Sequence, residues 1–132
     1  MLHLSIRNAT IRITRFNYLA FMEKKMNYKK QEIQEYFNDW IKDQDQDWIN
    51  DNVDDLHHHA FNSDYYICYT YDAKQWLGDQ VFNIIDFIKE YEQFNFGEVT
   101  TDFSCPVAIV NMYVYIIGEE IVWDYINQLE VA

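Results

Sequence analysis

The chain has only three glycines and one proline among its 132 residues, and it has no low-complexity or linker-like stretch. Nothing therefore indicates a break between two domains, and the length suits one globular domain with its own core. The sequence also lacks P-loop, GxGxxG, GxSxG, HExxH and CxxC motifs. We therefore predict that the protein is not an enzyme, that it has no catalytic residues and that it uses no cofactor.

Cysteine is scarce as well, since Cys68 and Cys105 are the only two and show no metal-binding spacing. We expect both to be buried free thiols. The first residues lack the apolar core of a signal peptide, and the longest apolar stretch, Val107 to Ile117, is too short to span a bilayer. The sequence therefore predicts a soluble cytoplasmic protein that does not contact a membrane.

Positive charge is rare beyond residue 30. Seven Lys or Arg and one acid give residues 1–30 a charge of +6, whereas three lysines and 21 acids give residues 31–132 a charge of −18. The acidic part of the chain is repelled by nucleic acid and by anionic membranes. We therefore expect no direct binding to nucleic acid. We divide the chain into a basic extension or β element at residues 1–25 and one acidic globular domain at residues 26–132.

The apolar pattern predicts a mainly α fold of the α+β type. We expect a compact bundle of four or five helices, with a small β element from the N-terminal segment, where Leu2, Leu4 and Ile6 alternate. From Asn27 the spacing becomes helical. Helices are predicted from Asn27 through Ile41, over residues 47–60, over residues 79–94 and over residues 119–129, with one or two helical turns over 72–78. Tyr65 to Tyr71 has high β propensity and fits a short strand. Residues 107–117 fit a buried strand or a buried helix, and the proline at their start favours the helix.

Carboxylates recur at helical spacing between residues 31 and 60, where nine acids accompany a single lysine, Lys42. Two rows are formed, Glu32, Glu35, Asp39 and Asp43 in the first, and Asp47, Asp51, Asp54 and Asp55 in the second. Like charges three or four residues apart on a helix repel one another. The rows are therefore either ordinary solvated faces or a surface for a cationic partner. We predict a partner-binding surface made of both rows and Trp48, which falls at the edge of the second.

Three adjacent histidines, His57, His58 and His59, follow the second row. They cannot all bind one ion from a regular helix, because successive side chains point about 100° apart. Asp54 with His58, or Asp55 with His59, has the spacing to hold a divalent ion. Zinc sites draw three or four ligands from converging elements, however, and the remaining candidates are scattered. We therefore predict no metal site.

Three segments carry a resemblance to known sequences: LHHHAFNSDYYICYTYDAKQWLG (56–78), IKEYEQFNFGEVTTDFS (88–104) and NMYVYIIGEE (111–120). They resemble small acidic proteins encoded in tailed-phage genomes, over about residues 50–120. The resemblance transfers no catalytic motif, but it implies a context, because small acidic phage proteins are often inhibitors of host defence. Among these are anti-restriction and anti-CRISPR proteins that mimic DNA.

Charge and resemblance together predict a non-enzymatic inhibitor that acts as an acidic DNA mimic in the cytoplasm of an infected host cell. Its partner is expected to be a host nucleic-acid-binding protein with a basic groove, and homodimer formation stays open. Two alternatives remain. One is a phage structural or assembly module that oligomerises through aromatic surface, and the other is a small metal-dependent enzyme that uses Asp54 and His58.

Overall fold

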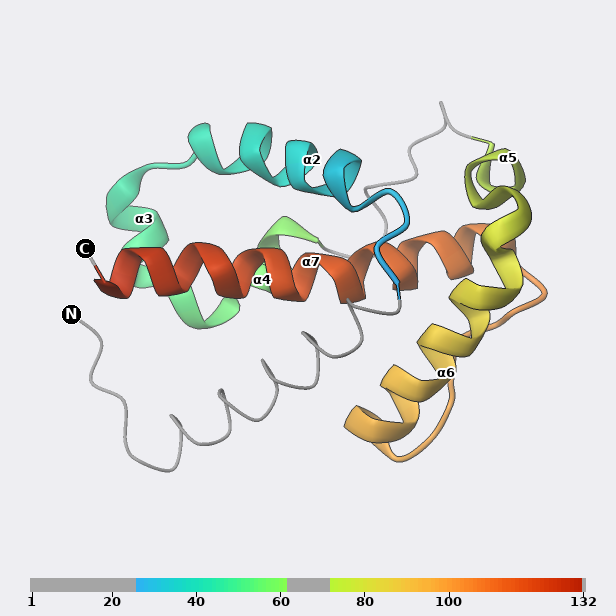
Figure 1. Ribbon diagram of the computed structural model, residues 1–132. Coiled ribbons are helices and arrows are strands. Elements are labelled where there is room, and N and C mark those ends of the chain that lie inside the picture. Colours follow the sequence, from blue (N-terminus) through green and yellow to red (C-terminus); the bar gives the residue numbers. More distant parts are fainter. Residues whose placement is uncertain (1–25, 62–71, 132) are drawn as a thin grey trace.

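The computed structural model describes residues 26–61 and 72–131, and 80% of the described residues are helical. The helices pack around a long central one (Figure 1), so the predicted mainly helical bundle is confirmed. The described residues contain no strand. The β element predicted from residues 1–25, the strand predicted at Tyr65 to Tyr71, and Cys68 all lie outside the described residues.

The central element is α7 (Pro106–Val131), against which α2, α4, α5 and α6 all pack. Pro106 opens it at a first-turn position, where the missing backbone N–H costs no helical hydrogen bond. Residues 107–117 are therefore helical, as the proline indicated. They continue without a break into residues 119–129, so the two helices expected here are one.

By length and composition alone, α7 could cross a membrane. Its most apolar window, between Pro106 and Leu129, has a mean hydropathy of 1.2, but 61% of that window is buried inside the protein. Ile109, Tyr113 and Ile117 are each at most 2% exposed. Burial of this extent is what the core helix of a soluble bundle shows, because its apolar surface is covered by the surrounding helices.

Helix α2 (Lys30–Lys42) corresponds to the helix predicted from Asn27 through Ile41, and one of its faces is apolar. Ile33 and Phe37, one turn apart, are almost fully buried, and Trp40 packs against the same core. Burying an aromatic or branched side chain of this size contributes about 1.5–3 kcal/mol to stability. Packing of this face therefore holds α2 in place, and its other face is left for charged residues.

The single helix predicted over residues 47–60 is wrong, because the structure divides this stretch into three short pieces. They are α3 (Gln46–Asp51), the 3-10 helix η1 (Val53–Asp55) and α4 (Leu56–Ala60). Asn52 ends α3 with a non-helical backbone (φ −119°, ψ 21°), and both its backbone N–H and its side-chain amide donate to the Trp48 carbonyl oxygen, at 3.0 and 2.8 Å. The apolar residues at helical spacing in this stretch, Ile49, Val53, Leu56 and Ala60, are buried nevertheless.

The segment from Asp72 to Gly97 folds largely as its pattern predicts. The Asp72 side chain caps α5 (Ala73–Leu77), and the short η2 (Gly78–Gln80) leads into α6 (Val81–Phe96). Helix α6 ends at Gly97, whose φ of 75° is a left-handed conformation that glycine adopts without steric cost. Figure 1 shows α6 crossing one end of α7 while α2 and α4 lie further along it.

Gly118 brings α4 close to the middle of α7. A Cβ atom at this position would lie 2.5–2.7 Å from three ring atoms of Phe61, the residue that follows α4. Phe61 is 4% exposed, and its ring packs on those of Tyr36 and Phe37 from α2. Glycine is therefore required at position 118, because only a residue without a side chain lets the Phe61 ring pack against α2 and α7 at the same time.

Candidate functional site

The first acidic row is a line of exposed carboxylates on α2. Glu35, Asp39 and Asp43 follow at four-residue spacing, and all three are exposed. Four residues of α-helix rise about 6 Å, which sets the interval between these residues along the axis. Lys42 Nζ lies 3.3 Å from an Asp39 oxygen, but both side chains are largely exposed, so the pair contributes little stability.

Glu32, predicted as the first member of this row, is turned partly into the protein. Its Oε1 accepts a hydrogen bond from the indole nitrogen of Trp76 at 3.1 Å, and Lys29 Nζ lies 3.8 Å from Oε2. Only 36% of its side chain remains exposed. Glu32 therefore fastens α2 to α5, and it is not equivalent to the exposed acids that follow it.

The second acidic row starts where the first one ends. Asp45 caps α3 by accepting a hydrogen bond from the Asp47 backbone N–H at 3.3 Å. Asp47 and Asp51, one turn apart on α3, are both exposed. The exposed acids of α2, α3 and their connection are called the α2–α3 carboxylates below: Glu35, Asp39, Asp43, Asp45, Asp47 and Asp51.

Trp48, predicted as a contact residue, is half-buried beside these acids. Its ring makes edge-to-face contacts with Trp40 on α2 and His59 on α4, at centroid distances of 6.1 and 5.1 Å. Aromatic contacts of this kind are each worth about 0.5–1.5 kcal/mol beyond burial. Trp48 thus holds α3 against both neighbours and fixes the α2–α3 carboxylates on packed helices. Its contact with a partner stays a prediction.

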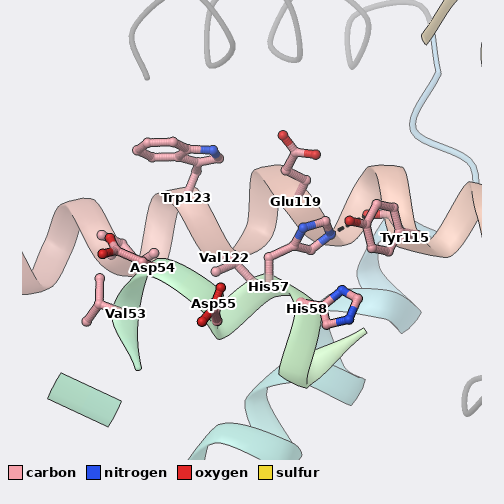
Figure 2. A pocket seen from close by; sticks show the side chains of 10 residues that line it. Val53, Asp54, Asp55, His57, His58, Tyr115, Glu119, Val122 and Trp123 are labelled. Atoms are coloured by element: carbon pink, nitrogen blue, oxygen red, sulfur yellow. Dashed lines mark hydrogen bonds between the residues drawn. The ribbon is translucent and has the colours of Figure 1, made fainter. Parts of the chain in front are cut away.

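Asp54 and Asp55 are separated from the rest of the second row by the break at Asn52. Both are exposed and lie on η1, where they line a cavity of about 320 Å³ between η1, α4 and α7 (Figure 2). Its wall also contains the side chains of Val53, His57, His58, Tyr115, Glu119, Val122, Trp123 and Ile126. It is called the His57 cavity below. The predicted binding residues therefore occupy two places.

His57 reaches from α4 to α7 across this cavity, as Figure 2 shows. Its Nε2 lies 2.8 Å from the Tyr115 carbonyl oxygen, and because a carbonyl can only accept, Nε2–H is the donor. His58 and His59 are exposed. In the part of the chain that the structure describes, no group of three or more His, Cys, Asp or Glu could hold a metal ion.

Buried carboxyl groups are the feature that sequence reasoning missed. Glu119 and Glu120, adjacent acids of a kind common on helix surfaces, are only 4% and 6% exposed, and Glu92 is 1% exposed. Glu119 Oε2 accepts a hydrogen bond from the Tyr91 hydroxyl. Burial raises the pKa of Glu120, an effect that the charge of Lys30 opposes.

Glu92 has its own set of donors in the connection after α6. The Thr100 hydroxyl donates to Glu92 Oε2 at 2.8 Å, and the Thr101 backbone N–H donates to Oε1 at 3.2 Å. The carboxylate therefore holds the loop between α6 and α7. Its acidic side chain stabilises the fold and does not contribute to the exposed charge.

A second hollow, of about 640 Å³, lies between the end of α6, the following loop and the start of α7. Phe96 and Val107 line it and are 53% and 43% exposed. The Asn111 Oδ1 atom in its wall is buried without a hydrogen-bond partner. Mostly apolar walls with a few polar groups suit an apolar ligand or surface.

Comparisons with known proteins add no assignment for these residues. No family model, curated protein or solved structure matches the chain. The function proposed for the chain therefore rests on its own surface.

Proposed function

We propose that the protein is a phage-encoded, non-enzymatic inhibitor that mimics DNA. It occupies the basic groove of a host nucleic-acid-binding defence protein, of the kind that anti-restriction or anti-CRISPR proteins block, in the cytoplasm of the infected cell. The observation that carries the proposal is the set of α2–α3 carboxylates, all of them exposed and accompanied, between residues 35 and 51, by one lysine, Lys42.

Spacing supports mimicry. Glu35, Asp39 and Asp43 rise about 6 Å per step along α2, an interval close to that between successive phosphates of a nucleic-acid strand. Proteins that bind DNA do so mainly through Lys and Arg contacts to phosphate, with release of counterions. A protein surface with carboxylates at this interval can satisfy the same Lys and Arg side chains.

Rigidity supports it as well. The acids lie on helices whose opposite faces are buried through Ile33, Phe37 and Ile49, and Trp48 joins the two helices. In the free protein, the packing of these buried faces therefore offsets the repulsion among the carboxylates. A preorganised anionic surface loses little conformational entropy on binding, and a cationic groove would relieve its repulsion.

A charge-reversal variant tests the proposal. Replacing Glu35, Asp39, Asp47 and Asp51 by Lys should leave the helical circular-dichroism spectrum and the melting transition intact, because all four side chains are exposed. It should abolish capture of nucleic-acid-binding proteins from a nuclease-treated lysate of host cells.

A matched control reverses four equally exposed acids at the other end of the molecule, Asp79, Asp86, Glu90 and Glu98. This control changes the net charge by the same amount and should keep partner capture. If both variants lose partner capture equally, the net charge alone accounts for the binding, and the α2–α3 carboxylates are not the binding site.

Exposed aromatics on α6 favour a second candidate, a phage assembly module. Phe82, Phe94 and Phe96 are 77%, 54% and 53% exposed, and apolar surface of this kind is what an assembly contact would use. If this is the working surface, the protein should self-associate with increasing concentration in gel filtration. Phe82→Ser should then reduce association, whereas the charge reversals on α2 and α3 should not.

A further inference from the structure

We propose that the hollow between the end of α6, the following loop and the start of α7 binds a small amine with an apolar body, of the arylalkylamine class. It is called the α6–α7 hollow below. The inference does not depend on the proposed function, because none of the α2–α3 carboxylates lines this hollow. It assigns a ligand site to a different face of the protein.

The size and the walls of the α6–α7 hollow suit a small molecule. Its volume of about 640 Å³ falls within the range of about 300–1,000 Å³ that small-molecule sites occupy. Phe96 and Val107 contribute exposed apolar surface, and Ala108 and Met112 continue the wall one turn apart along α7. The unbranched side chain of methionine adapts readily to the shape of a ligand. We therefore expect an aromatic or aliphatic body to enter the hollow.

Asn111 marks where a hydrogen-bond donor of the ligand would bind. It lies in the wall of the hollow, and its Oδ1 atom is buried without a hydrogen-bond partner. The large majority of buried polar side-chain atoms have a partner, because a buried acceptor without a donor costs free energy. A ligand N–H directed at Oδ1 would supply the missing donor. The orphaned oxygen thus selects a ligand that can donate.

Negative charge in the wall selects a cationic donor over a neutral one. The Thr100 hydroxyl and the Thr101 backbone N–H each donate to one oxygen of Glu92, which fixes this carboxylate in the wall. Hydrogen bonds from the side chain and the backbone of Ser104 lower the pKa of Asp102, so this second lining carboxylate is ionised at neutral pH. None of the described residues that line the hollow is Lys or Arg. An ammonium group therefore fits the wall better than a hydroxyl group does.

The first turn of α7 contributes charge of the opposite sign. The N-terminus of a helix carries about half a positive charge, which by itself would attract an anion. The two lining carboxylates, Glu92 and Asp102, outweigh this partial charge. The loop over residues 97–105 adds Glu98 and contains no Lys or Arg. The balance at the hollow is therefore negative, and an anionic ligand is disfavoured.

Titration of the full chain, labelled with ¹⁵N, with tryptamine tests the site by NMR. Tryptamine should bind saturably, and the shifted amide signals should be concentrated in residues 92–96 and 100–112. Tryptophol has the same indole body with a hydroxyl group in place of the amine, and it should bind at least about tenfold more weakly. Indole-3-propionate carries a carboxylate there and should show no saturable binding. The three probes thus isolate the effect of the head group.

Two variants test the residues that select the amine. Asn111→Leu keeps the approximate size of the side chain but removes the acceptor, so tryptamine binding should weaken at least about tenfold. The free variant should melt at the same or a higher temperature, because the orphaned oxygen is gone. Asp102→Asn keeps an acceptor for Ser104 and should weaken the binding of tryptamine but not that of tryptophol. The matched Asp79→Asn removes the same charge from an exposed site on η2 and should leave both affinities unchanged.

Several results would overturn the proposal. They are the absence of saturable tryptamine binding, equal binding of tryptamine and tryptophol, and saturable binding of indole-3-propionate. Shifts centred on the α2–α3 carboxylates, or on residues 53–57 and 122–126 of the His57 cavity, would also contradict it. So would undiminished tryptamine binding by a folded Asn111→Leu variant. If that variant does not fold, the three probes on the wild-type chain decide the question.

Discussion

Gly118→Ala is expected to destabilise the protein, although alanine is ordinarily the better residue inside a helix. Gly118 lies within α7, where the change alone would stabilise the helix by about 1 kcal/mol. The new methyl group, however, would lie 2.5–2.7 Å from three atoms of the Phe61 ring. Ordinary contacts between carbon atoms are about 3.5–4 Å, so the ring or α7 must move.

The ring has little room to move. Phe61 is 4% exposed and packs against Tyr36 and Phe37 at centroid distances of 5.5 and 6.1 Å. Overpacking of a filled core costs about 1–3 kcal/mol, and contacts this short place Gly118→Ala in the upper part of that range. After subtraction of the helix-propensity gain, we expect a net loss of about 1–2 kcal/mol.

Urea denaturation followed by circular dichroism measures this loss, and Phe61→Ala provides the matched background. In that background the methyl group meets no ring, so Gly118→Ala should become stabilising, by up to about 1 kcal/mol. The change of sign is a coupling energy between the two positions. If Gly118→Ala stabilises the wild-type chain, or costs the same in both backgrounds, the contact between Phe61 and α7 is wrongly described.

Three further outcomes are expected. Phe37→Asp places a charge at a site that is 1% exposed and should unfold the domain, seen as loss of the cooperative melting transition; a wild-type melting curve would contradict the orientation of α2. His57→Asn removes the 2.8 Å hydrogen bond to the Tyr115 carbonyl and should lower the free energy of unfolding by about 1 kcal/mol, whereas the exposed His58→Asn should change it by less than about 0.5 kcal/mol. Glu120→Gln should stabilise the protein at neutral pH. Because burial raises the pKa of Glu120, the folded state binds its proton more tightly, and that contribution to stability is lost as pH rises through the folded-state pKa. The wild type should therefore melt at a higher temperature at about pH 5 than at about pH 7.5, and the difference should shrink in the variant.

Elements with a clear period could be predicted from the sequence. Helices α2 and α6 have apolar residues at helical spacing and a recognisable end, such as Gly97, so local signals determine them. The stretch from residue 47 to residue 60 has the same period, yet Asn52 divides it. The apolar spacing continues through the break, and Ile49, Val53, Leu56 and Ala60 are all buried, so the period marks the residues that face the core but not the place where the helix is interrupted.

The candidate site could be predicted only in part, because exposure depends on distant residues. Glu32 and Glu35 look alike in the sequence. Glu32, however, accepts a hydrogen bond from Trp76, which is 44 residues away, whereas Glu35 is exposed. Glu119 and Glu120 are charged neighbours of the kind found on helix surfaces, and they are buried because α7 is covered by other helices over most of its length. No local pattern contains this information.

The measurement that tests mimicry most directly is displacement of DNA from the captured partner. A labelled duplex bound to that partner is titrated with the protein, at about 50 mM and about 500 mM salt. We predict that the protein displaces the duplex, that its affinity falls steeply with salt, and that the variant with Lys at Glu35, Asp39, Asp47 and Asp51 displaces nothing. Binding of equal strength at both salt concentrations, without displacement of the duplex, would contradict DNA mimicry and would favour the exposed aromatics of α6 as the interface.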